Sequence, residues 1–353
     1  MLFRSNTVAV ELDGKIHITG AGTCTIYANQ AGDATYNPAA QQSQTLTIAK
    51  AVLTVTADNT SVVYGDPEPT YTYQFSGFVN GDTENLISGV PAINTSYTNT
   101  TPVSSSPLII TTNIGSLSAN NYDFATENGE LTITRKNQAI TFNALAAKTY
   151  GAPTFNLTAT ASSGLTVSYE SSNTAVASIS GNTVTIEGAG TTTITAKQAG
   201  NGDYNTAADV QQTLTVNKAI LTVTAQNEAV TYGETPPVYT YNITGFVNGD
   251  NATSVTGTPA LSSNYTTTSS VSLSPMDILC QIGTLSANDY DFTFVNGELS
   301  IAKSNQTITF NPLADKTYGA VPFDLTATAG TGLTVDYSSS VGSVATVFGS
   351  TVT

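Results

Sequence analysis

Close pairs of carboxylates are the first candidates for a catalytic site in this chain. Three pairs stand two residues apart: Asp66 and Glu68, Asp82 and Glu84, and Asp289 and Asp291. Residues two apart on a strand point to one face, and glycosidases use two carboxylates. The chain repeats itself after 168 residues, and the repeat has Ala252 for Glu84 and Asn121 for Asp289. We therefore expect solvated loop carboxylates and a chain that is not an enzyme.

Asp82 and Asp250 are the candidate calcium ligands. Each follows an Asn-Gly pair, which brings turn oxygens and a carboxylate together. Calcium takes about six to eight oxygen ligands, and no loop of this chain has the dense acidic pattern that supplies them. We expect no cofactor and no other metal site, with calcium at these two aspartates as the alternative.

The other side chains that could take part in catalysis or binding are expected to have structural roles. His17 is the only histidine and lies on an alternating strand, so it is expected to be an exposed residue rather than a general base. Tyr71, Tyr73 and their repeats Tyr239 and Tyr241 could form a sugar-binding face, but no Trp reinforces it. We expect packing roles for the tyrosines, with those of the Tyr-Gly pairs fastening a loop through the phenol.

Composition restricts the partners and the fold class. The 353 residues include 10 Lys+Arg and 25 Asp+Glu, giving a net charge of −15. Nucleic acids and anionic membranes are not expected as partners, because phosphate binding needs clustered cations. The chain has no run of about 18 apolar residues, the length needed to cross a membrane. Met1–Ser5 is too short for a signal peptide.

The sequence predicts that these residues lie on strands and on the turns between them. Segments such as Leu53–Ala57 and Thr192–Ala196 alternate apolar residues with Thr, which is typical of half-buried strands. Gly, Asn, Asp and Pro clusters separate them every 8–12 residues or so, the spacing of a β-sandwich. The sequence predicts an all-β chain: a tandem array of small β-sandwich modules arranged end to end.

Internal repetition sets the expected domain boundaries. Residues 51–82 recur at 219–250, and four Tyr-Gly pairs divide the repeat into two alternating module types. Residues 51–136 and 219–303 are the first type, and residues 137–218 are the second. Residues 1–50 match the C-terminal half of the second type, and residues 304–353 match its N-terminal half. We expect a fragment of a longer reading frame, whose half-modules are disordered or pair between molecules.

The motifs of both module types carry a resemblance. Tyr-Gly-Asp-Pro, Gly-Phe-Val-Asn-Gly-Asp and Asn-Gly-Glu-Leu-Thr-Ile, in residues 52–135 and 220–303, resemble the bacterial MBG domain of the YGX type. The stretches 169–177 and 188–196 are similar to bacterial Ig-like domains. The resemblance implies repetitive, adhesin-like proteins that are secreted or lie on the bacterial cell surface.

The expected function follows from module type and from the lack of catalytic residues. We expect a non-catalytic stalk or spacer of a large extracellular or cell-surface adhesin-like protein. The alternative is a spacer or weak glycan-binding array in a secreted polysaccharide-degrading enzyme whose catalytic domain lies outside this fragment. Any surface ligand, protein or glycan, is expected to contact the variable loops 84–106 and 252–274. The sequence does not identify that ligand.

Overall fold

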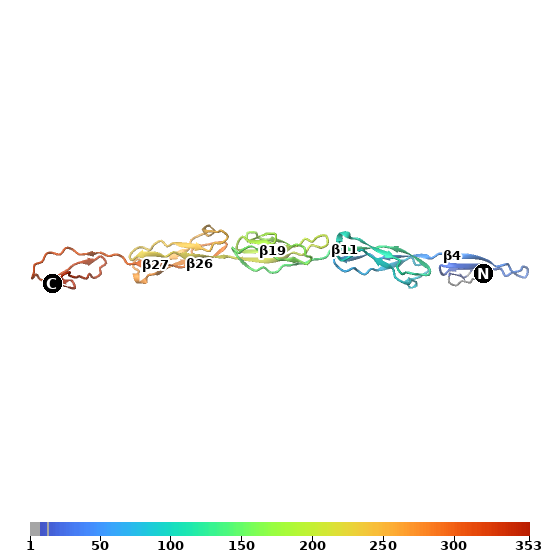
Figure 1. The fold of residues 1–353 in the computed structure, drawn as a ribbon, viewed down its shortest axis with the longest axis horizontal. Helices are drawn as coiled ribbons and strands as arrows, with labels where there is room; N and C mark the ends of the chain where they lie inside the picture. The colour runs from blue at the N-terminus through green and yellow to red at the C-terminus, as the bar shows by residue number, and fades with distance from the viewer. Residues whose placement is uncertain (1–7, 13) are drawn as a thin grey trace.

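The described chain consists of strands joined by short connections. The computed structural model describes residues 8–12 and 14–353. Within these ranges it has strands and four 3-10 helices but no α-helix, so the predicted all-β class is confirmed. The modules lie end to end in a single row, with the two half-modules at opposite ends (Figure 1).

Alternating side chains form the strands and give each one a buried face. In β5 (Ala51–Ala57), Leu53, Val55 and Ala57 are buried while the residues between them are partly or fully exposed. β27 (Gly297–Ala302) alternates in the same way along its whole length. Because β-branched and apolar residues favour a pleated, half-buried surface, this pattern directs one face of each strand into a sandwich.

The first module, residues 51–136, has two facing sheets. The smaller sheet has the order β10-β5-β7 and the larger one the order β6-β11-β9-β8. β10 runs parallel to β5, and β11 runs parallel to β6. The other elements are β6 (Thr60–Val63), β7 (Tyr73–Ser76), η1 (Glu84–Leu86), β8 (Ala92–Asn94), η2 (Val103–Ser105), β9 (Leu108–Asn113), β10 (Tyr122–Glu127) and β11 (Gly129–Thr134).

The third module, residues 219–303, repeats this arrangement. Its sheets have the orders β23-β21-β26 and β22-β27-β25-β24, with the same two parallel pairings. Its elements are β21 (Ala219–Ala225), β22 (Glu228–Thr231), β23 (Tyr241–Thr244), η3 (Ala252–Ser254), β24 (Ala260–Ser262), η4 (Val271–Leu273), β25 (Met276–Gln281), β26 (Tyr290–Val295) and β27.

The middle module, residues 137–218, has its own topology. A four-stranded sheet β13-β20-β19-β16 lies with the sheet β14-β18-β17 and the pair β12-β15. Its strands are β12 (Ile140–Thr141), β13 (Lys148–Thr149), β14 (Phe155–Asn156), β15 (Thr160–Ala161), β16 (Ser168–Ser171), β17 (Ala177–Ser180), β18 (Thr183–Ile186), β19 (Gly190–Lys197) and β20 (Val210–Asn217).

Each half-module has part of this middle-module topology. The N-terminal half-module, residues 8–50, forms the two hairpins β1-β2 and β3-β4. The C-terminal half-module, residues 304–353, forms the pair β28-β30 and the sheet β29-β32-β31. The strands are β1 (Ala9–Leu12), β2 (Lys15–Ile18), β3 (Gly22–Ala28), β4 (Gln42–Ile48), β28 (Ile308–Thr309), β29 (Phe323–Asp324), β30 (Thr328–Ala329), β31 (Val347–Phe348) and β32 (Thr351–Val352).

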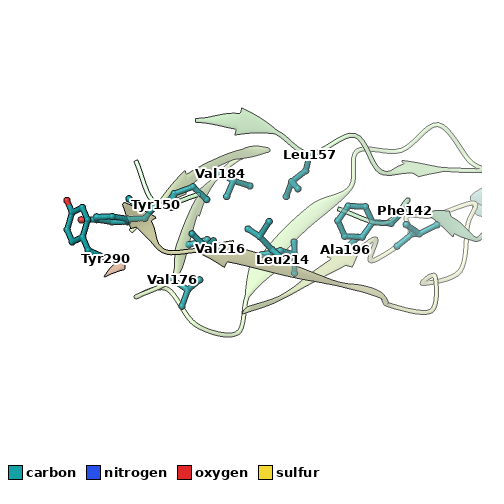
Figure 2. Close-up of a cluster of buried hydrophobic side chains, with 14 of the residues drawn as sticks. Phe142, Tyr150, Leu157, Val176, Val184, Ala196, Leu214, Val216 and Tyr290 are labelled. Atoms are coloured by element: carbon teal, nitrogen blue, oxygen red, sulfur yellow. The ribbon is translucent and has the colours of Figure 1, made fainter. Parts of the chain in front are cut away.

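The largest buried cluster crosses from the middle module into the third. Ile194 and Leu214 are fully buried in it, and Leu221 and Tyr290 of the third module belong to the same cluster. Figure 2 shows Tyr290 against Tyr150 at one end of this cluster. The first module and the remainder of the third have separate clusters of their own.

We predict that Leu214→Ala lowers the unfolding free energy of the middle module by about 2–5 kcal/mol, because it leaves a cavity in a filled core. Hydrogen exchange of the β19 and β20 amides measures this loss. Val238→Ala, at a side chain that is 87% exposed, is the matched control and should change those amides by less than about 0.5 kcal/mol. Equal effects of the two substitutions would contradict the assigned core.

Candidate functional site

The junction between the middle and third modules has almost no connecting chain. β20 ends at Asn217 and β21 begins at Ala219, so Lys218 alone separates the two strands. The Ala219 N–H donates to the Asp289 carbonyl at 2.9 Å. The Lys218 ammonium donates to the carbonyl of Ala287 at 2.9 Å. The backbone therefore enters the third module already hydrogen-bonded to it.

A carboxylate joins one tyrosine from each module at this junction. The Asp250 Oδ2 accepts from the Tyr290 hydroxyl at 2.6 Å and from the Tyr150 hydroxyl at 3.0 Å. The Tyr290 hydroxyl in turn accepts from the Val247 N–H at 3.1 Å. The two rings meet edge to face at 5.5 Å, an arrangement that adds to their burial (Figure 2).

These contacts shift the pKa values of the groups that make them. The hydroxyls of Tyr290 and then Tyr150 stabilise the ionised carboxylate and hold the pKa of Asp250 below its usual value. Burial, followed by the adjacent carboxylate, raises the pKa of Tyr290 to about 12. Burial also raises the pKa of Tyr150. At neutral pH the junction has two phenol donors and one carboxylate acceptor, which is the protonation state that its hydrogen bonds require.

Close backbone approach completes the junction. Gly151 has a φ of +85°, and a Cβ built there would lie 2.5 Å from the Val247 side chain. Only glycine fits both this conformation and this gap. On the opposite side, the Asp289 Oδ1 accepts from the Ala189 N–H at 2.6 Å. The Tyr-Gly turn and the Gly-Ala-Gly turn of the middle module thus both press against the third module.

The junction between the N-terminal half-module and the first module keeps part of this arrangement. The Asn121 Oδ1 accepts from the Ala21 N–H at 3.0 Å, as Asp289 does from Ala189. The Tyr122 hydroxyl donates to the Asp82 Oδ2 at 2.7 Å. No residue takes the place of Tyr150 among the described contacts of this junction. Instead, a cavity of about 340 Å³ lies between the two parts.

A different set of contacts joins the first module to the middle module. The Asp203 carboxylate accepts from the Val103 N–H at 2.8 Å, and its carbonyl accepts from the Lys136 N–H at 2.9 Å. Tyr64 and Tyr204 meet edge to face at 5.5 Å. The loop around Asp203 therefore caps the end of the first module.

The structure places the two candidate calcium ligands at separate junctions. Asp82 and Asp250 each bind a tyrosine hydroxyl, as described above. Among residues 8–12 and 14–353, no group of three or more His, Cys, Asp or Glu side chains is arranged to hold a metal. Calcium at either aspartate stays a prediction, and the chemistry that the structure shows for both is hydrogen bonding.

The other candidate side chains also have structural contacts. Asp66 pairs with Lys136 at 3.1 Å, and Glu68 accepts from the Tyr71 hydroxyl at 3.0 Å. His17 is exposed on β2. Tyr71 packs against the buried cluster of the first module. None of these contacts brings a nucleophile to a base.

The two candidate binding loops are tied down by tyrosines that the sequence analysis did not single out. In loop 84–106, the Tyr97 hydroxyl donates to the Asp66 carbonyl at 2.7 Å. In loop 252–274, the Tyr265 hydroxyl donates to the Glu234 carbonyl at 2.9 Å. These tyrosines, rather than those of the Tyr-Gly pairs, fasten the loops. Tyr97 and Tyr265 occupy the same position of the 168-residue repeat. This recurrence is the sequence signal that could have identified them.

Two stretches of the chain, residues 53–132 and 221–300, match the family described as MBG domain (YGX type). The chain contains two MBG domains. The MBG part of the resemblance drawn from the sequence motifs is thereby confirmed, and the Tyr122–Asp82 and Tyr290–Asp250 pairs belong to these MBG domains. No curated protein matches the chain.

Solved structures of other multi-domain proteins resemble the chain only distantly. Drosophila N-cadherin EC1-4 is 8% identical with a TM-score of 0.24, and the match covers 85% of this chain and 91% of that one. The N-terminal four Ig domains of Dscam1 isoform 7.44 are 13% identical with a TM-score of 0.24, covering 85% and 88%. These scores are too low to support an argument.

In the part of the chain that the structure describes, no helix has the length and apolarity needed to cross a membrane.

We predict that Asp289→Ala speeds hydrogen exchange of the Ala189 amide by roughly 10- to 100-fold, because a hydrogen bond to a charged acceptor is lost. Asp289→Asn is the matched control, since Asn121 holds the Ala21 amide in the same way. The Asn variant should keep most of the protection. Equal acceleration in both variants would exclude the side-chain hydrogen bond as the cause.

We also predict two pH limits for the same junction. Tyr290 has a raised pKa, so its contribution to stability is complete below pH 10.0 and is lost as the pH rises towards about 12. Asp250 has a pKa lowered from 3.8, so its contribution is present above that value and is lost as the pH falls further. Urea unfolding followed by circular dichroism across pH measures both limits.

Two variants assign these limits to their groups. Tyr290→Phe should reduce the alkaline loss of stability, to which Tyr150 also contributes, and Asp250→Asn should reduce the acidic loss, when each is compared with the unsubstituted chain. The difference in unfolding free energy between each variant and the unsubstituted chain should therefore change with pH. A difference that is the same at every pH would contradict the assignment.

Proposed function

We propose that this chain is a non-catalytic stalk or spacer segment of a large, adhesin-like bacterial protein that is secreted or held at the cell surface. The observation that carries the proposal is the hydrophobic cluster shared by the middle and third modules. Two modules that share a core cannot rotate independently without exposing it to water. Such a junction transmits orientation along the array, which is what a stalk must do.

The hydrogen bonds at the junctions support the same conclusion. Tyr150 and Ala189 reach across from opposite turns of the middle module to Asp250 and Asp289. Contacts on two sides of the connecting strand oppose bending in either direction. The bond from Val103 to Asp203 plays a corresponding role at the preceding junction.

The placement of the acidic residues supports a non-catalytic role. Asp66, Asp82, Asp250 and Asp289 are each engaged by a lysine, a tyrosine or a backbone amide. A general acid or base needs an exchangeable proton within reach of a substrate. Here the same carboxylates hold modules and turns together.

Module type and composition support the extracellular location. The chain has two MBG domains and a low charged fraction of 10%. Its modules are small sandwiches that each have their own buried residues, as arrays that extend by repetition require. A partner, protein or glycan, would meet the exposed parts of the loops 84–106 and 252–274, such as Leu86 and Leu273.

Small-angle X-ray scattering of the chain tests the stalk. Five segments in the row (Figure 1), each about 30 Å long, give a rod of about 150 Å and a radius of gyration near 43 Å. A compact chain of this length would give about 20 Å. The scattering curve of the unsubstituted chain should show the intermediate-angle region that is typical of a rod. This region should be less pronounced in the Tyr150→Ala, Asp289→Ala double variant. A compact radius, or a flexible profile in the unsubstituted chain, would overturn the proposal.

A further inference from the structure

Each MBG domain holds two long segments of chain side by side in parallel. In the first module, β5 pairs with β10 over six residues, beginning with Ala51 opposite Tyr122. β6 pairs with β11 over four residues, ending with Val63 opposite Thr134. Two residues join β5 to β6 and one joins β10 to β11, so the two pairings form one parallel ribbon that crosses from the smaller sheet to the larger.

The third module repeats this parallel ribbon along the axis of the row. β21 pairs with β26 over six residues, and β22 pairs with β27 over four. Figure 1 shows β26 and β27 one after the other along the long axis of the module, with β27 farther from the middle module. The chain enters each MBG domain at the first strand of its ribbon and leaves at the last strand, at the opposite end of the module.

Tension along the row would therefore shear the ribbon. The entering strand and the leaving strand are pulled in opposite directions along their own length, because they run parallel and are held at opposite ends. Ladder hydrogen bonds run from strand to strand, so the two strands can slide only if many of these bonds break together. Opening a ladder from one end would instead break its bonds one at a time.

Further pairings hold the other edges of the ribbon strands. β5 also pairs with β7 over four residues, and β11 also pairs with β9 over three. The third module has the same supports, since β21 pairs with β23 over four residues and β27 pairs with β25 over three. Neither the entering nor the leaving strand can detach without breaking ladders on both of its sides.

The middle module meets the same tension with much shorter pairings. Its first strand, β12, pairs with β15 over two residues. β13 pairs in parallel with the last strand, β20, at Lys148 opposite Val216 and at Thr149 opposite Asn217. Residues 142–147 separate β12 from β13, so these two pairings are loaded one after the other. β20 itself is held by β19 over seven residues, which leaves the N-terminal side of the module as the weaker one.

The large buried cluster of the middle module does not change this order. Hydrophobic burial is non-directional and contributes to the free energy of unfolding. Unfolding under force is governed by a rate, which depends on the contacts that the pulled strands must break first. In the middle module those contacts are the two short pairings of β12 and β13.

We propose that the two MBG domains resist tension along the chain and that the middle module is the extensible element, which unfolds first under force. When it unfolds, residues 137–218 lengthen from about 30 Å to about 280 Å. That extension lowers the tension on the MBG domains and keeps them folded. The proposal rests on the proposed stalk function, because a stalk is a segment that is held under tension between its two ends.

Single-molecule force spectroscopy at constant force, on the full chain held at its two ends, tests the proposal. Each complete module should lengthen the chain by about 240–280 Å when it unfolds. The middle module should unfold at least about 10-fold faster than either MBG domain, because its short pairings yield in turn whereas a ribbon yields as a whole. The three steps have similar lengths, so variants are needed to assign them to modules.

Three disulfide-locked variants make this assignment. Each replaces two exposed residues that lie opposite each other in a parallel pairing, so the fold should be kept. The variants are Val52→Cys with Asp123→Cys, Ile220→Cys with Asp291→Cys, and Thr149→Cys with Asn217→Cys. The disulfide takes the tension past the residues that it encloses, so the step of the locked module should shrink to about 50 Å or less. Reduction should restore the full step, which makes each variant its own control.

The identity of the shortened step decides the outcome. The lock across β13 and β20 should remove the fastest of the long steps, and each MBG lock should remove one of the slower ones. A fastest step that is removed by an MBG lock, or rates that agree within about 10-fold for all three modules, would overturn the inference. Neither result bears on the scattering of the unstretched chain, so failure of this inference and failure of the stalk proposal are distinguishable.

Discussion

The single residue between β20 and β21 is the constraint on which the rest of this structure depends. A strand that ends one sandwich and begins the next leaves no slack, so the turns at the facing ends of the two modules are brought into contact. Polar groups caught there must find partners, because unpaired buried groups are costly. Tyr150, Tyr290 and Asp250 satisfy one another in the space this creates.

The same constraint explains the contacts of two acidic residues at this junction, Asp250 and Asp289. A carboxylate at a junction can accept from donors of both modules at once, which neither a hydroxyl nor an amide does with comparable strength. Asp250 accepts two phenols and Asp289 accepts a backbone amide across the boundary. These two carboxylates thus contribute to joining the middle module to the third.

The two kinds of junction use different solutions to one problem. Between the middle module and the third, a tyrosine is buried and the hydrophobic cluster is continuous. Between the first module and the middle module, the Asp203 loop and the Tyr64–Tyr204 ring contact form the cap. Ile18 and Tyr318 are exposed, whereas their equivalents Ile186 and Tyr150 at the junction between the middle and third modules are buried.

The all-β class, the repeat, the MBG domains and the order of the modules could all be predicted from the sequence. These depend on alternation, turn residues and periodicity, which are local or follow from comparing the chain with itself. The contacts of Asp82 and Asp250 could not be predicted in this way, and neither could the division of the tyrosines between fastening loops and joining modules. Those partners are as much as 100 residues apart, as Tyr150 and Asp250 are. No local pattern encodes such a meeting, because it is created by the packing of two folded modules against each other.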